Sequence, residues 1–233
     1  MAPVGRILAI QLTLLLGCVL AENLISNGDF ENGLDNWSVN KSAGVDFYVA
    51  FGSTLYVLPN QLGEENSTIL VGEQFFISAG VVYQEFTVPP GAVSILLNFQ
   101  YWYYSDADII VRNNTLDYEG ISNQQFRVDL FEGDLASDPF DMASIYQQLF
   151  VTEEADIGDN WIQFHEEVAV TAEQSYTFRI AVVTTEGPLN LGIDNVNVTA
   201  VFEETSSGHI LKAVFALTTL LSAFFVMWSL NNQ

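Results

Sequence analysis

Short runs in which hydrophobic and polar residues alternate fill the middle of this 233-residue chain. In the clearest run, residues 93–104, the odd positions from Val93 to Tyr103 are all apolar or aromatic, and the polar side chains stand at even positions. Residues 125–131 and 176–184 repeat the alternation. Because neighbouring side chains of a β-strand point to opposite faces, each run predicts a strand with one face toward a core.

Between Asn23 and Phe202, no stretch has the 3.6-residue period of an amphipathic helix. Further runs rich in β-branched and aromatic residues are bounded by Gly, Pro, Asn and Asp. They predict additional strands at 46–51, 54–58, 81–88, 162–170 and 193–202. Many short strands without intervening helices favour an all-β fold, a two-sheet antiparallel jelly-roll sandwich. We expect one such domain over residues 22–204.

The first 21 residues differ from this pattern. They contain one charge, Arg6, followed by an uncharged apolar run from Ile7 to Leu20. A charged start and a short apolar run are typical of a secretory signal peptide, and the run is short for a membrane span of about 20 residues. The alternative is a bacterial lipoprotein signal, because residues 15–18 loosely resemble the cysteine box of such signals.

The C-terminal residues 210–233 form a second apolar segment, and no charge occurs between Ala213 and Leu230. The short spacer before it, residues 205–209, holds three small side chains, those of Ser206, Ser207 and Gly208. Small residues, a spacer and a terminal hydrophobic tail are typical of a glycosylphosphatidylinositol (GPI) attachment signal, and a transmembrane helix is the alternative. Both predict a domain held at the outer face of the plasma membrane.

The charge of the chain excludes one class of partner. Six Lys and Arg stand against 29 Asp and Glu, and the formal net charge is −23. Residues 22–204 hold four of the basic residues and all 29 acidic ones, which leaves −25 for the predicted domain. Nucleic-acid phosphates are bound by clustered Lys and Arg, so we expect no nucleic-acid partner.

Cysteine and sequon positions also suit a secreted domain. The one cysteine, Cys18, lies in the predicted signal peptide, so the mature domain is expected to depend on packing rather than disulfides. Five Asn-x-Ser/Thr sequons predict a cell-surface glycoprotein. The sequon asparagines are Asn36, Asn40, Asn66, Asn113 and Asn197.

Several segments resemble a known family. Residues 23–37 read NLISNGDFENGLDNW, residues 83–92 read YQEFTVPPGA, and residues 192–196 read GIDNV. These resemble the opening strand and turn, the second strand and the closing strand of the galactose-binding-like jelly rolls found among carbohydrate-binding modules. MAM-type adhesion domains, which usually carry cysteines that this domain lacks, are the second choice.

The resemblance implies a structural calcium ion where the first and last strands of the domain meet. Calcium takes oxygen ligands from carboxylates and carbonyl groups. The positions that match are Asp29 or Glu31 in the opening turn and Asp194 in the closing strand. The alternative is that Asp29 and Asp194 accept hydrogen bonds from local backbone, as aspartates in turns often do.

The polar face of residues 93–104 is the candidate ligand site. Aromatic rings cover the apolar faces of sugars, while amide and guanidinium groups bind sugar hydroxyls. Alternation also places two arginines and an aspartate outward in other strands, where they could join this face. The predicted ligand-binding residues are Asn98, Gln100, Trp102, Tyr104, Arg127, Asp129 and Arg179.

No catalytic set is predicted. His165 and His209 have no spacing to partners that would build a triad or a zinc site, and adjacent carboxylates such as Glu166 and Glu167 point to opposite faces of a strand. We therefore expect a non-catalytic, surface-anchored module that binds carbohydrate or glycoprotein in adhesion. A structural or protein-binding surface glycoprotein is the alternative, and a glycan hydrolase of the same fold is a third.

Overall fold

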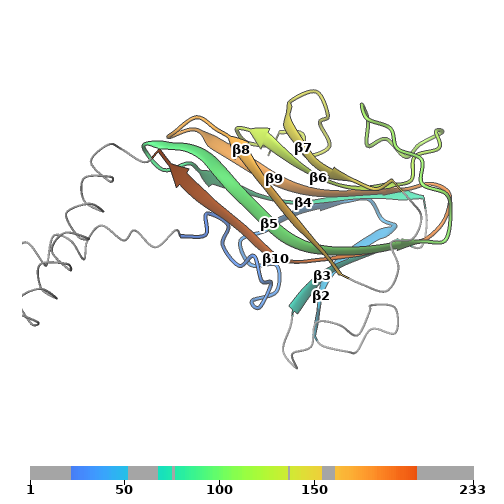
Figure 1. The fold of residues 1–233 in the computed structure, drawn as a ribbon. Coiled ribbons are helices and arrows are strands. Elements are labelled where there is room, and N and C mark those ends of the chain that lie inside the picture. The colour runs from blue at the N-terminus through green and yellow to red at the C-terminus, as the bar shows by residue number, and fades with distance from the viewer. Residues whose placement is uncertain (1–21, 52–67, 75–76, 136, 154–160, 204–233) are drawn as a thin grey trace, which may run out of the picture. The chain divides into compact units, whose positions relative to one another are not determined.

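Ten β-strands make up the regular structure in the described part of the chain, which in the computed structural model comprises residues 22–51, 68–74, 77–135, 137–153 and 161–203. Sheet A has the order β2 (Val45–Phe51), β3 (Thr68–Gln74), β10 (Leu189–Phe202), β5 (Ala92–Ser105), β8 (Ile162–Ala169). Sheet B has the order β1 (Ser38–Lys41), β4 (Ser78–Thr87), β9 (Ser175–Thr184), β6 (Gln125–Glu132), β7 (Ile145–Val151). The two antiparallel sheets pack face to face (Figure 1) and confirm the predicted jelly-roll sandwich.

The core lies between the sheets and is built from the inward positions of the alternating runs. The aromatic ring of Phe99 in β5 lies 4.4 Å from that of Phe164 in β8 and 5.9 Å from that of Phe178 in the opposite sheet. Each fully buried side chain of this kind stabilises the fold by ~1.5–3 kcal/mol. The predicted inward residues found in this core include Ile95, Leu97, Phe126, Val128, Leu130, Tyr176, Ile180 and Val182.

The opening segment, residues 23–37, lies against the end of the last strand. The backbone N–H of Leu24 donates to the carbonyl oxygen of Val198 at 2.7 Å. A Cβ added at Gly28 would lie 2.0 Å from the carbonyl oxygen of Val196, so no side chain fits between the two backbones. The start and the end of the predicted domain therefore meet, as the jelly-roll interpretation requires.

Loops cover part of the outer face of sheet B. Leu116, from the loop between β5 and β6, packs on Val81 of β4 and on Val183 of β9 in a small hydrophobic cluster outside the main core. Tyr118 and Phe140 border this cluster from two different loops. This part of sheet B is therefore enclosed by its own connections.

Three strands were missing from the sequence prediction, namely β1, β3 and β7. All four residues of β1 are exposed at the edge of its sheet, so no apolar alternation marks them. The pairing of β7 with β6 is irregular between Val128 and Asp129 and again between Leu130 and Phe131, which breaks a strict period of two. The strand expected at 54–58 lies outside the described residues.

The chain divides into a compact unit ending at Val201 and a second unit, Phe202–Gln233, of which Phe202 and Glu203 are described. The described residues include no helix long and apolar enough to cross a membrane. The predicted signal peptide, the spacer with Ser206, Ser207 and Gly208, and the apolar tail lie outside the described residues.

Candidate functional site

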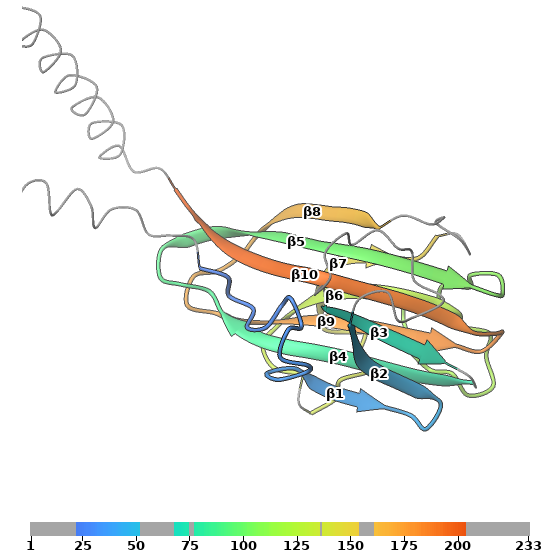
Figure 2. The ribbon, with the colours of Figure 1, turned by 90° about the horizontal axis from the view of Figure 1, so that it is seen from below.

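The outer face of sheet A carries a row of polar side chains. Because the odd positions of β5 from Ile95 to Tyr103 enter the core, Asn98 and Gln100 lie on the outer face, as predicted. Strand β5 lies between β8 and β10 (Figure 2), and in β8 His165 is paired with Asn98 and Gln163 with Gln100. Directly paired residues of antiparallel strands share a face. The imidazole Nδ1 of His165 lies 2.6 Å from Oδ1 of Asn98.

Strand β10 adds Asn195 to this face through a local irregularity. Ile193 and Val196 both enter the core although they are three residues apart, so the strand accommodates one extra residue between them. Asn195 has φ 53°, a left-handed conformation that asparagine adopts more readily than most residues. Its Nδ2 donates to Oε1 of Gln100 at 3.1 Å. We call the resulting set the amide face; it consists of Asn98, Gln100, Gln163, His165 and Asn195.

Aromatic residues stand at one end of the amide face. Trp102 and Tyr104 follow on the same side of β5, but Trp102 is 4% exposed whereas Tyr104 is 36% exposed. Trp102 therefore packs within the protein, and the prediction that it offers an open ring to a sugar is wrong. The exposed ring at this end belongs to Tyr104.

Trp161 is an aromatic residue of this region that is not among the predicted ligand-binding residues. The register that pairs Tyr101 with Ile162 brings Trp161, the residue before β8, to the aromatic end of the face. Its indole Nε1 is buried and has no hydrogen-bond acceptor among the described residues. Its position just before a predicted strand was the signal that could have identified it.

Asp194 lies between the amide face and the opening segment. It is 3% exposed, and burial, together with the nearby carboxylates of Asp29 and Glu31, raises its pKa from 3.8 to about 7. The backbone N–H of Asn195 donates to its Oδ1 at 2.7 Å and opposes this rise. The Nδ2 of Asn195, which also binds Gln100, donates to Oδ2 of Asp194 at 3.2 Å.

The predicted calcium ligands Asp29, Glu31 and Asp194 are close enough to influence one another but do not converge. Among the described residues, no three acidic, histidine or cysteine side chains lie close enough together to form a metal-binding group. Oδ1 of Asp29 instead accepts the backbone N–H of Glu31 at 3.4 Å, as in the turn alternative. Asp29 also lines a cavity of about 360 Å³ with Gly28 and Asn195. A calcium ion there would need backbone or amide oxygens to complete its shell.

The predicted ligand-binding residues do not form one patch, because they lie on opposite sheets. Asn98, Gln100, Trp102 and Tyr104 belong to sheet A. Arg127, Asp129 and Arg179 belong to β6 and β9 of sheet B. Alternation correctly places all seven away from the core, but the outer faces of a sandwich point in opposite directions. The patch that combined aromatic rings with arginines is therefore wrong.

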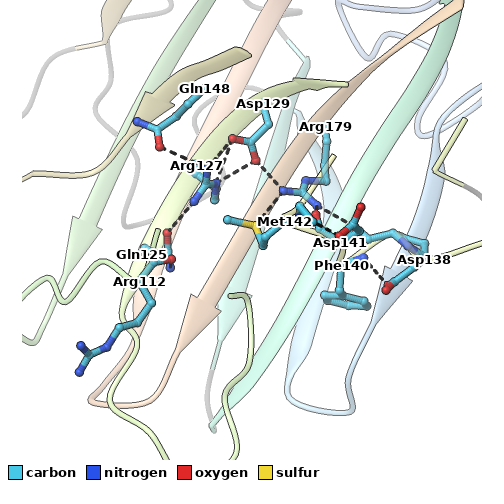
Figure 3. A network of polar contacts seen from close by, with 12 residues as sticks. Arg112, Gln125, Arg127, Asp129, Asp138, Phe140, Asp141, Met142, Gln148 and Arg179 are labelled. Atoms are coloured by element: carbon cyan, nitrogen blue, oxygen red, sulfur yellow. Dashed lines mark hydrogen bonds and ion pairs between the residues drawn. The ribbon is translucent and has the colours of Figure 1, made fainter. Parts of the chain in front are cut away.

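Arg127, Asp129 and Arg179 form a buried charge network (Figure 3). Each of the three residues is at most 1% exposed. Nη2 of Arg127 lies 2.6 Å from Oδ1 of Asp129, and Nη2 of Arg179 lies 2.7 Å from Oδ2. Arg127 also donates to Oε1 of Gln125 at 3.4 Å and to Oε1 of Gln148 at 3.3 Å. One carboxylate therefore serves two buried cations.

Arg179 binds the loop before β7 to the outer face of sheet B. Its Nη1 donates to the carbonyl oxygens of Pro139 at 3.0 Å and Asp141 at 2.7 Å, and its Nη2 lies 3.2 Å from Sδ of Met142. Burial lowers the pKa of Arg179, and the charge of Asp129 opposes that change. Because the loop covers the network, these side chains stabilise the structure and are not presented to a ligand.

The adjacent carboxylates of β8 point to opposite faces, as predicted. Glu167 accepts a hydrogen bond from Ser94 on the outer face of sheet A. Glu166 accepts one from Nε2 of Gln147 in β7 at 3.3 Å, on the other side of the strand. This pair does not converge on one substrate.

The sequon asparagines are distributed over both sheets and the loops. Asn36 and Asn113 are exposed in loops, Asn40 is exposed in β1, and Asn197 is half-buried in β10. Asn66 lies outside the described residues.

Comparisons with known proteins give fold-level likeness only. No protein-family model and no curated protein sequence matches the chain. Among solved structures, the module TmCBM61 in complex with beta-1,4-galactotriose has a TM-score of 0.49 and 12% identity, over 78% of this chain and 100% of that one. The CBM22-1 xylan-binding domain from Paenibacillus barcinonensis Xyn10C has a TM-score of 0.44 and 11% identity, over 79% and 97%.

A third similar structure is the enzymatically active domain of tailspike protein 4 from bacteriophage CBA120. It has a TM-score of 0.47 and 15% identity over 77% of this chain, and the match spans 21% of the tailspike chain. Similarity at this level does not establish a family, a ligand or an activity for this protein.

Proposed function

We propose that the amide face binds carbohydrate and that the protein is a non-catalytic binding module at the outer surface of a cell. The observation that carries the proposal is the row of amides and an imidazole across β10, β5 and β8, which ends at the exposed ring of Tyr104. Amide groups can both donate and accept, which suits sugar hydroxyls, and an aromatic ring suits the apolar face of a sugar.

The spacing of the row supports an extended ligand. Neighbouring strands lie ~4.8 Å apart, so Gln100 and its partner Gln163 offer polar groups at successive positions across the sheet. The hydrogen bonds already present, from Asn195 to Gln100 and between His165 and Asn98, hold these side chains in position before a ligand arrives. Side chains held in this way lose less conformational entropy on binding.

The location of the module is a separate part of the proposal. We infer from the apolar segments of the sequence that the chain enters the secretory pathway and is held at the outer face of the plasma membrane by its C-terminal residues. The domain's net charge of −25 opposes contact with anionic lipid headgroups, which suits attachment through a terminal segment.

A glycan array probed with the purified protein tests the binding proposal. Gln100→Ala and Tyr104→Ala are each expected to weaken binding to a captured glycan about tenfold, equivalent to ~1.4 kcal/mol, because each removes one contact of the face. The matched controls are Asn114→Ala, an exposed loop amide, and Tyr146→Ala, an exposed tyrosine of sheet B. Absence of binding across the array, or equal losses in the controls, would contradict the proposal and favour a protein-binding role.

A further inference from the structure

A second cavity lies on the other side of the molecule, between the edge strand β1 and the loops that cover sheet B. Its volume is about 490 Å³, within the ~300–1,000 Å³ of typical small-molecule sites. Its lining combines polar and aromatic side chains, among them those of Asn40, Lys41, Asp117, Tyr118 and Phe140. None of the described residues that line this cavity belongs to the amide face.

The side chain of Asn40 belongs to the outer face of sheet B. Asn40 is paired with Val81 in β4, and directly paired residues of antiparallel strands share a face. Val81 is part of the small hydrophobic cluster on that outer face, which Tyr118 and Phe140 border. Asn40 is exposed and lines the cavity that these two aromatic residues also line.

Asn40 is also the acceptor of a sequon, Asn40-Lys41-Ser42. A glycan linked to its Nδ2 would begin at the wall of the cavity rather than in open solvent. The sugar next to the protein would meet two aromatic rings, which cover apolar sugar faces, and the carboxylate of Asp117, which accepts from hydroxyls.

We infer that an N-linked glycan on Asn40 packs its first sugar into this cavity and binds the loops of Tyr118 and Phe140 to the edge of sheet B. The glycan thereby covers β1, an exposed edge strand whose unpaired backbone groups could otherwise pair with another chain. The inference requires the secretory route of the proposed function but not carbohydrate binding by the amide face.

Asn36 provides the comparison within the same protein. Its sequon, Asn36-Trp37-Ser38, ends on β1, but Asn36 is exposed and is absent from the cavity lining. Asn36 has φ 69°, so its own replacement would add backbone strain. Ser38→Ala removes this sequon without changing Asn36. At the other site, Asn40→Gln is the suitable change, because Oγ of Ser42 accepts the backbone N–H of Ala79 at 3.0 Å.

The test is release of glycans from the native full-length chain produced in cells that carry out N-glycosylation. Mass spectrometry measures occupancy and the rate at which peptide N-glycosidase removes the glycan at each site. We expect at least tenfold slower release at Asn40 than at Asn36 in the folded protein, and equal rates after denaturation. Tyr118→Ala should raise the Asn40 rate toward that of Asn36.

Thermal unfolding gives a second readout, which does not require the Tyr118→Ala variant to fold normally. Asn40→Gln should lower the melting temperature of the glycosylated protein, whereas Ser38→Ala should not. An unoccupied Asn40 in a secreted protein, equal release rates at the two sites, or equal melting temperatures of the two variants would overturn the inference. Retention of the chain inside the cell would instead contradict the secretory route.

Discussion

Replacement of Asp129 by Asn is the most direct test of how sheet B is stabilised. In the native protein both carboxylate oxygens of Asp129 accept hydrogen bonds, from Nε and Nη2 of Arg127 and from Nη2 of Arg179. An asparagine keeps one oxygen but turns an NH₂ group toward one of the two guanidinium groups. The variant therefore leaves two buried cations adjacent with no counter-charge between them.

The expected cost is large because the network is almost fully buried. Asp129 and Arg179 are 0% exposed and Arg127 is 1% exposed, so water does not replace the lost contacts. Removing one partner of a buried ion pair typically costs ~3–5 kcal/mol, against a total stability of ~5–15 kcal/mol for a domain. For a domain of this size, ~4 kcal/mol corresponds to a melting temperature lower by about 10 °C.

Urea denaturation of the purified protein, followed by tryptophan fluorescence, measures this difference. Asp46→Asn is the matched control, because the Lys41–Asp46 pair has a similar distance of 2.6 Å but side chains that are 39% and 64% exposed. Exposed pairs contribute ~0–1 kcal/mol, so the control should unfold almost like the wild type. If Asp129→Asn also unfolds within 1 kcal/mol of the wild type, the network does not stabilise the loop before β7 as we describe.

Four further outcomes are expected. With chelator present, the free energy of unfolding should fall as the pH rises from about 4 to above 7. Folding raises the pKa of Asp194 from 3.8 to about 7, so in this pH range the native state holds a proton that the unfolded state has released. The loss is at most ~4 kcal/mol, and urea denaturation of Asp194→Asn should not show this dependence on pH. If calcium binds there, a hundredfold excess over its dissociation constant should add ~2.7 kcal/mol, and calorimetry should show no such gain in the same variant. Gly28→Ala should lower the free energy of unfolding by ~1–3 kcal/mol, because the added Cβ would lie 2.0 Å from the carbonyl oxygen of Val196. The control Gly187→Ala should change the free energy of unfolding much less, because its added Cβ would lie 3.2 Å from the Cβ of Ala107. Phosphatidylinositol-specific phospholipase C should release the protein from cell membranes if the C-terminal anchor is a lipid, and leave it bound if the anchor is a helix.

Sequence periodicity predicted the parts of the fold that depend on a single strand. Phe126, Val128 and Leu130 face the core because a strand with a buried face must alternate, and the same rule placed Arg127 and Asp129 on the opposite side. Periodicity does not say which strands are neighbours, however. It therefore could not separate the arginines of sheet B from the amides of sheet A.

The remaining features depend on contacts between distant segments. The outward arginines are buried because the loop before β7 folds over them, and the sequence of a loop carries no comparable period. Asn195 joins the amide face only because β10 accommodates an extra residue between Ile193 and Val196. Trp161 stands outside the alternating run of its strand, so its place beside the face follows from the register of β8 with β5.

The two hydrogen bonds of the Asn195 amide connect a buried carboxyl group to the amide face. The same NH₂ group donates to Oδ2 of Asp194 and to Oε1 of Gln100, so proton uptake by Asp194, near neutral pH, weakens the acceptor on one side of a shared donor. A ligand that engages Gln100 acts on the same donor from the other side. If the proposed glycan binding at the amide face changes the proton affinity of Asp194 through this amide, protonation of Asp194 must change the glycan affinity by the same factor, because linkage between two binding equilibria is reciprocal.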